Sequence, residues 1–187
     1  VGFPFMPLQS GEMEIYCYCE HSIKAFRRWL ENKYGHIEEL NEAYRWNATN
    51  ERYTSFDQVD TPKAAPTAWS SVTRWIDWRK FWMDNTAAFV KWQNDIIKQL
   101  DKEHPTTTNT FFMKSQDPFG VRMGLDQMKI AQSVDMFGID IYPGSGNKAV
   151  LKPECSSMCL DMGRSIARRL GKPLLLLETE SGPINGW

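Results

Sequence analysis

The run "LLLLETESGP", Leu174 to Pro183, places an apolar strand directly before two acids. Four successive leucines bounded by turn residues are typical of a strand that is buried on both faces, as in a parallel sheet. A carboxylate at the end of such a strand is costly unless it is paired or takes part in chemistry. Leu174, Leu176 and Glu178 alternate by two, so we expect them to share one face of the strand.

Outward from this run, helix and strand patterns alternate along the 187 residues. Apolar residues recur every three or four positions and predict helices over 22–35, 37–46, 70–103, 124–134 and 155–171. In the last of these we expect Met158, Met162, Ile166 and Leu170 to face inward, with Gly171 as the cap. Residues 1–12 are predicted to be a strand that runs into a loop, further strands are predicted over 106–112, 134–144 and 172–178, and a long loop is predicted over 47–69. This order predicts an α/β fold in which crossover helices connect parallel strands.

Polar side chains follow the predicted strands, at the ends where α/β proteins gather their chemistry. These side chains are Glu12 with Glu14, Asn109, Asp140 with Tyr142, and Glu178 with Glu180. We therefore expect a rim on which acids lie opposite acids.

Several segments resemble one enzyme family, in order along the chain. "GEMEIYCYCEHSIKAFRRWLENKYG", residues 11–35, resembles the segment around the catalytic acid of the family 42 glycoside hydrolases, the β-galactosidase type. "TTTN", "VDMFGIDIYP" and "LLLLETESGPINGW" are similar to later segments of that family. The resemblance implies part of a TIM (β/α)8 barrel, approximately its βα units four to seven. Residues 1–187 are then expected to be one partial catalytic domain, truncated at both ends and inactive alone.

The resemblance also implies roles for individual residues. Glu12, five residues before Cys17, matches the acid/base, and Glu14 is displaced from that position by two. Glu178, rather than Glu180, matches the nucleophile. Asn109, Asp140, Tyr142 and Trp187 are the expected substrate-binding residues, although Asn109 and Tyr142 could equally terminate strands and Asp140 could support a turn. Two carboxyls on opposite sides of a glycosidic bond perform retaining hydrolysis, here expected on terminal β-D-galactosides.

Two departures from the family pattern leave alternatives open. Gly11 stands where the family has an asparagine whose amide helps bind the sugar, so a noncatalytic carbohydrate-binding or scaffold remnant is the alternative function. Ser22 replaces the third cysteine of a zinc-binding cluster, which leaves Cys17 and Cys19 as weak metal candidates. Cys155 and Cys159 could complete a four-thiolate site, but they fit helix core positions more simply. We therefore expect no cofactor and no structural zinc.

Composition narrows the classes of partner. The 22 Lys and Arg nearly balance the 23 Asp and Glu, and without a basic run nucleic acid is not an expected partner. No apolar stretch approaches the roughly 20 residues that span a bilayer, so no membrane segment is expected. An oligosaccharide or β-galactoside is the expected partner, an oligomeric parent protein is compatible with the sequence, and the compartment stays open with the cytoplasm favoured. The 8 Trp, 6 Tyr and 10 Phe fit either core packing or stacking on sugar rings.

Overall fold

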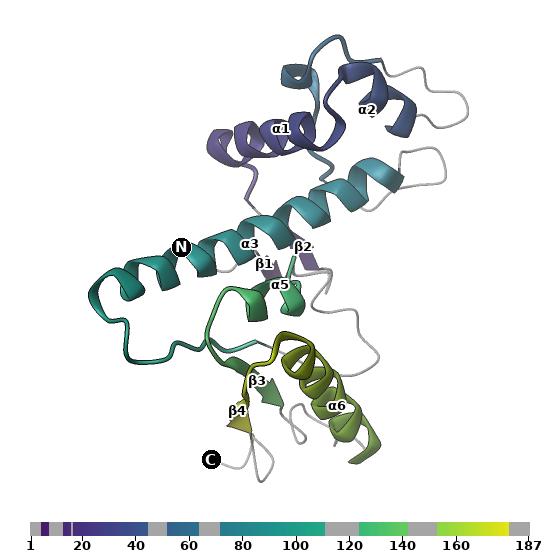
Figure 1. Ribbon diagram of the computed structural model, residues 1–187. Coiled ribbons are helices and arrows are strands. Elements are labelled where there is room, and N and C mark those ends of the chain that lie inside the picture. The colour runs from purple at the N-terminus through teal and green to yellow at the C-terminus, as the bar shows by residue number, and fades with distance from the viewer. Residues whose placement is uncertain are drawn as a thin grey trace. The chain divides into compact units, whose positions relative to one another are not determined.

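The computed structural model (Figure 1) divides into two compact units. Unit 1 comprises Val1–Met83 with Arg122–Gly124, and unit 2 comprises Asp84–Val121 with Leu125–Trp187. The structure describes residues 5–7, 13–15, 17–44, 52–63, 72–110, 124–141 and 153–179, of which 5–7 and 13–15 are described by their backbone alone. The predicted residues Glu12, Tyr142, Glu180 and Trp187 lie outside these ranges.

Unit 1 contains two short strands, β1 (Phe5–Pro7) and β2 (Met13–Ile15), which pair antiparallel. The expectation of one strand that joins a wholly parallel sheet is therefore wrong here. The physical reason is the length of the connection. A parallel crossover needs a dozen or more residues, and the connection between these strands is the five residues numbered 8–12. Glu14, expected at a strand end, is the middle residue of β2.

Three predicted helices of unit 1 are confirmed and enclose an aromatic core. They are α1 (Glu20–Tyr34), α2 (Ile37–Tyr44) and the first part of α3 (Val72–Leu100), with a short 3-10 helix, η1 (Phe56–Gln58), inside the predicted loop. Gly35, at φ 74°, ends α1 in a conformation that suits glycine. Trp78 contacts Phe26 edge-on at 5.0 Å and stacks on Phe81 at 5.4 Å between ring centroids. Eight buried residues form this core: Phe26, Leu30, Leu40, Tyr44, Val59, Trp78, Phe81 and Trp82.

Unit 2 contains the parallel pair that the leucine run predicts. β3 (Phe137–Ile141) and β4 (Leu174–Thr179) are joined through α6 (Pro153–Leu170), and the short helix α5 (Gln127–Gln132) precedes β3. Met136 and Asp140 also donate backbone hydrogen bonds to the carbonyls of Thr106 and Thr110, at 3.0 and 2.8 Å. The segment 106–110 therefore runs beside β3, although its described residues form no regular strand.

Helix α6 packs against β3 and β4 through a different face from the predicted one (Figure 1). Met158 and Met162, expected inward, are 42% and 48% exposed, so that expectation is wrong. Small residues are buried instead: Cys159, Gly163 and Ala167. A Cβ on Gly163 would lie 3.0 Å from Ile139 Cδ1, so the helix approaches the sheet closely because no larger side chain intervenes. Ile166 and Leu170 are half-buried against the same cluster, as expected.

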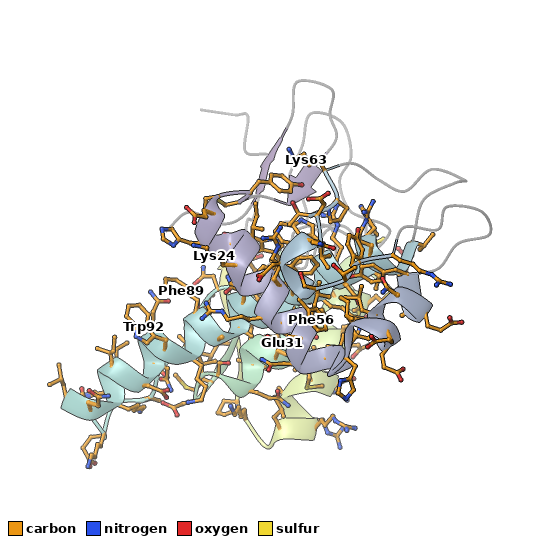
Figure 2. The ribbon with its side chains drawn as sticks, turned by 90° about the horizontal axis from the view of Figure 1, so that it is seen from above. Lys24, Glu31, Phe56, Lys63, Phe89 and Trp92 are labelled. Atoms are coloured by element: carbon orange, nitrogen blue, oxygen red, sulfur yellow. The ribbon has the colours of Figure 1, made fainter. Side chains whose placement is uncertain are left out.

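The second part of α3 has an exposed apolar face. Phe89 and Trp92 stack at 5.7 Å between ring centroids, and Figure 2 shows both on this stretch of the helix. Trp92 is 57% exposed, and the large apolar residues exposed after it on α3 are Ile96, Ile97 and Leu100. Among the described residues, no helix is long and apolar enough to cross a membrane.

Lys172, just before β4, binds carbonyl groups at the C-terminal end of helix α5 and just after it. Its Nζ donates to the carbonyl oxygens of Ala131 at 2.7 Å and Gln132 at 3.2 Å, and also to that of Val134. A helix leaves its last carbonyls without partners in the helix itself, and a cation there also suits the helix dipole. Lys172 therefore ties α5 to the start of β4.

Replacing Lys172 with Met should destabilise unit 2 by about 1–3 kcal/mol, because a charged donor is lost and partly buried carbonyls remain. Chemical denaturation followed by circular dichroism measures this loss. Lys102→Met, which removes an exposed lysine by the same change, is the matched control and should have little effect. Equal loss in both variants would contradict the role of Lys172.

Candidate functional site at the ends of the parallel strands

Three of the predicted site residues meet where the extended segments of unit 2 end. Asp140 of β3 pairs in register with Glu178 of β4, and its backbone N–H donates to Thr110 on the other side. Asn109 Nδ2 donates a hydrogen bond of 2.6 Å to Glu178 Oε1. Because Asn109 and Glu178 come from the segments that flank β3, this hydrogen bond joins them across the strand, beside Asp140.

The sheet has two distinct faces at this point. Phe137, Ile139 and Ile141 belong to the buried cluster that packs on α6, and we call this side the α6 face. Gly138 and Asp140 alternate with them and define the opposite side, the acid face. Thr107 lies on the acid face as well, with Oγ1 2.9 Å from the position of a Cβ on Gly138. The Asn109 amide is on the same side, close enough to Asp140 to act on the pKa of its carboxyl.

Glu178 does not share a face with Leu174, contrary to the expectation from alternation. Leu174 packs against the α6 cluster, whereas Glu178 is bonded to Asn109 on the acid face. The pairing explains the difference: Ile139 pairs with Leu176 and Asp140 pairs with Glu178, so Leu177 is an extra residue in β4. Such a β-bulge changes the side to which the following residue points.

Sequence reasoning missed the two residues around which this irregularity forms. Gly138 is an isolated glycine inside a strand pattern, which is a known sign of close approach by another chain segment. Leu177 carries no sign of its own, since it is one of four identical residues. The glycine was therefore the available signal.

Asp140 is a buried carboxyl group beside an acid. It is 0% exposed, and among the described residues neither of its carboxylate oxygens has a hydrogen-bond partner. Burial raises the pKa of Asp140, the charge of Glu178 raises it further, and the Asn109 amide opposes this shift in part. Folding therefore makes the Asp140 carboxyl harder to ionise than an aspartate side chain in water.

Replacing Asp140 with Asn should make stability less dependent on pH. The protonated Asp140 carboxyl contributes its full share to the stability of the folded protein below the ordinary aspartate pKa of about 3.9. That contribution is lost as the pH rises through the raised pKa of Asp140 in the folded protein. Asn cannot ionise, so the melting temperature of Asp140→Asn relative to the unmodified protein should increase from acid to neutral pH. Thermal melts across this range test the expectation, and a pH-independent difference would contradict it.

The described cysteines of unit 1 do not by themselves make up a structural zinc site. Cys17 and Cys19 are exposed, the Cys19 backbone N–H donates to Cys17 Sγ at 3.2 Å, and Ser22 Oγ lies 3.4 Å from Cys19 Sγ. A structural zinc ion takes four ligands, and the described residues contain no group of three His, Cys, Asp or Glu that could hold a metal. Cys159 is buried in the core of unit 2, in agreement with its interpretation as a core residue. The expectation of no zinc stays a prediction.

Cys19 should nevertheless be a reactive thiol. Hydrogen bonding by the Ser22 side chain, then by its backbone and by Cys17, lowers the pKa of Cys19 to about 7. Because the thiolate is the nucleophile, alkylation of Cys19 by iodoacetamide should rise with pH around a midpoint near 7. Ser22→Ala should move this midpoint upward, as measured by peptide mass spectrometry. The same midpoint in both proteins would contradict the role of Ser22.

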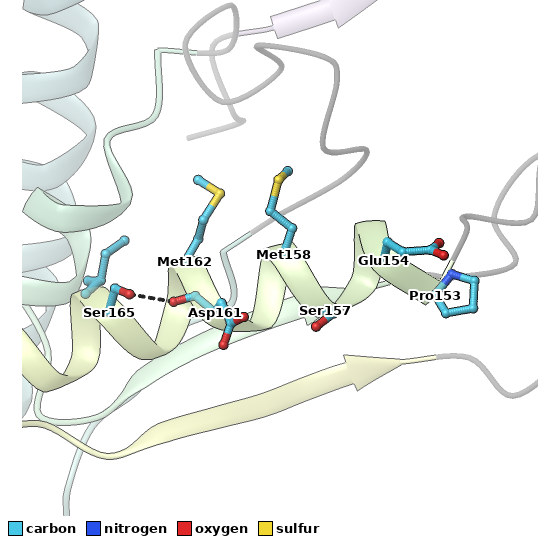
Figure 3. A pocket seen from close by; sticks show the side chains of 8 residues that line it. Pro153, Glu154, Ser157, Met158, Asp161, Met162 and Ser165 are labelled. Carbon is cyan, nitrogen blue, oxygen red and sulfur yellow. Dashed lines mark hydrogen bonds between the residues drawn. The ribbon is translucent and has the colours of Figure 1, made fainter.

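A surface groove elsewhere in unit 2 lies apart from these groups. Figure 3 shows it along α6, where Ser165 Oγ donates to the Asp161 carbonyl oxygen at 2.7 Å. Its lining residues all belong to that helix: Pro153, Glu154, Ser157, Met158, Asp161, Met162, Ser165 and Ile166. Because this lining comes from a single helix, whereas side chains from three segments meet at the strand ends, the strand ends are the better candidate site.

Comparison with known proteins identifies the family. The family 42 glycoside hydrolase model, described as β-galactosidase, matches residues 9–187. The β-galactosidase bgaB of Geobacillus kaustophilus is 30% identical over 169 residues, which cover 90% of this chain and 23% of that protein. The β-galactosidase GalA of Bacillus licheniformis is 31% identical over 178 residues, covering 90% of this chain and 25% of that protein.

Solved structures agree with this match. The β-galactosidase from the psychrophilic Marinomonas ef1 superposes with a TM-score of 0.73 at 26% identity, covering 91% of this chain and 26% of that one. The β-galactosidase from Halorubrum lacusprofundi superposes with a TM-score of 0.72 at 26% identity, covering 90% of this chain and 26% of that one. This chain thus spans about a quarter of the length of the relatives it matches. By these matches, the chain belongs to glycoside hydrolase family 42, the β-galactosidase family.

Proposed function

We propose that this chain carries the two catalytic carboxyls of a retaining β-galactosidase, with Glu178 as the nucleophile and Glu12 as the acid/base. The observation that carries the proposal is the 2.6 Å hydrogen bond by which Asn109 holds the Glu178 carboxylate at the strand ends. Membership of the family and the printed names of the relatives support a β-galactoside as substrate. The activity is proposed for the full-length polypeptide in which the chain occurs.

The proposed reaction has two displacements. In the first, the Glu178 carboxylate attacks the anomeric carbon while the Glu12 carboxylic acid gives its proton to the glycosidic oxygen. The bond to the leaving group breaks, and a covalent glycosyl ester forms on Glu178. In the second, ionised Glu12 takes a proton from water, the water oxygen attacks the anomeric carbon, and Glu178 is released as a carboxylate.

The neighbours of Glu178 suit this role. The Asn109 amide donates to Oε1, which stabilises and orients a carboxylate. Asp140 pairs with Glu178 in register, and burial raises the pKa of Asp140, which disfavours a second negative charge beside the proposed nucleophile. In this proposal Asn109 and Asp140 support Glu178 as well as line the sugar site. Tyr142 and Trp187 contribute sugar contacts.

The fold proposal accompanies the chemical one. The parallel order of segment 106–110, β3 and β4, with α6 as the crossover, supports three consecutive strands of a (β/α)8 barrel. With the segment that contains Glu12, residues 1–187 would correspond to βα units four to seven of one catalytic domain.

A noncatalytic sugar-binding role is the second candidate, and Gly11 is the observation that favours it. Without an asparagine before Glu12, a donor to the sugar is missing at that position. This role predicts that the protein binds galactose without hydrolysing galactosides, so calorimetric binding and turnover separate the two candidates.

In the full-length polypeptide, Glu178→Ala should abolish turnover of aryl β-galactosides, because no other group can form the glycosyl ester. Glu12→Ala should slow turnover by about 10²–10⁴-fold for poor leaving groups, and less for good ones, which need no proton. Steady-state kinetics over a series of leaving groups measures both effects. Glu180→Ala, two residues from Glu178, is the matched control and should reduce turnover only mildly.

Covalent labelling gives an independent test of the nucleophile. A 2-deoxy-2-fluoro galactoside should trap its ester on Glu178, as found by peptide mass spectrometry. Label on Glu180 would move the nucleophile there, and the absence of any label with binding intact would favour the noncatalytic role. A crystal structure should place the Glu12 and Glu178 carboxyls about 5–5.5 Å apart for a retaining enzyme.

A further inference from the structure

The extra residue in β4 decides which way Glu178 points. In regular parallel pairing, paired residues lie on the same face, as Leu176 and Ile139 do on the α6 face. Leu177 follows on the acid face, so strict alternation would return Glu178 to the α6 face. The pairing of Glu178 with Asp140 instead keeps Glu178 on the acid face.

Leu177 is held at this position by a space that Gly138 leaves open. A Cβ on Gly138 would overlap Leu177 Cδ1 and would lie 2.7 Å from the Thr108 carbonyl oxygen. The leucine side chain thus occupies the place where β3 would otherwise carry its own side chain. Contact with the backbone of β3 at Gly138 holds Leu177 as the extra residue of β4. This contact thereby sets the pairing of Glu178 with Asp140 that follows.

We propose that Leu177, seated on Gly138, is a positioning residue that turns Glu178 toward Asn109. This inference rests on the proposed function of Glu178 as the nucleophile. Bulges occur often beside active sites, where they redirect a side chain, and they are rare in parallel pairs. Without its contact on Gly138, β4 can pair regularly with β3, and Glu178 then lies on the wrong face for the sugar.

Two Leu→Ala variants of the full-length polypeptide test the contact. Leu177→Ala should lower kcat on an aryl β-galactoside by about 100-fold with little change in KM, because the nucleophile is misplaced while the sugar contacts remain. Leu176→Ala makes the same chemical change one residue away, on the α6 face, and should leave kcat and KM near those of the unmodified enzyme. Wild-type kcat in Leu177→Ala would overturn the proposal.

A deletion separates positioning from simple loss of packing. Removing one leucine from the run Leu174–Leu177 abolishes the extra residue, and regular alternation then carries Glu178 to the acid face opposite Asp140. The deletion variant should therefore have a higher kcat than Leu177→Ala, although it removes more of the protein. If packing alone mattered, the deletion would be the more damaging change, and a lower kcat would overturn the proposal.

Crystal structures of the variants give a readout that is independent of turnover. In Leu177→Ala the distance from Asn109 Nδ2 to Glu178 Oε1 should exceed hydrogen-bonding range, and in the deletion variant it should return near the present 2.6 Å. If the unmodified enzyme hydrolyses no galactoside, the proposed function fails, and these distances alone decide the positioning role. A hydrogen bond retained in Leu177→Ala would overturn it.

Discussion

Every residue of β3 is buried, although its fourth position is a carboxyl group. On the α6 face, burial comes from a helix that presents Cys159, Gly163 and Ala167 and so approaches closely. On the acid face, burial comes from the neighbouring segments, because Gly138 has no side chain and Leu177 and Thr107 take its place. Enclosure of this kind disfavours a charge on Asp140 and raises its pKa, whereas Glu178 accepts a hydrogen bond from Asn109 at the strand end.

The helices were predictable because their signals are local. Gly35 ends α1 as expected, and the expected helix over 70–103 is found as α3 at Val72–Leu100. The buried face of α6 was less predictable. Hydrophobicity favours large apolar residues there, whereas close approach of the helix to β3 requires small ones. Met158 and Met162 are apolar but too long for the contact with β3, and Gly163 is neither strongly apolar nor large. The sequence pattern therefore identified the helix and misjudged its buried face.

Three members of the candidate site were predictable, but their geometry was not. Asn109, Asp140 and Glu178 were placed together by counting strand ends, and the structure brings these three together. The face on which Glu178 lies depends on the contact between Leu177 and Gly138, which are distant in sequence. No periodicity within a run of four leucines contains that information. The antiparallel β1–β2 pair was missed for a related reason, since the short connection between two strands was interpreted as a loop alone.

The aromatic core of unit 1 gives the protein an internal spectroscopic reporter. Trp78 and Trp82 are buried among other rings, whereas Trp92, in unit 2, is largely in contact with water. Buried indoles emit at shorter wavelengths than hydrated ones, so hydration of Trp78 and Trp82 on opening of unit 1 would shift their emission to the red. Far-ultraviolet circular dichroism, in contrast, sums the helices of both units. Transitions that coincide by the two methods would mean that both units unfold together.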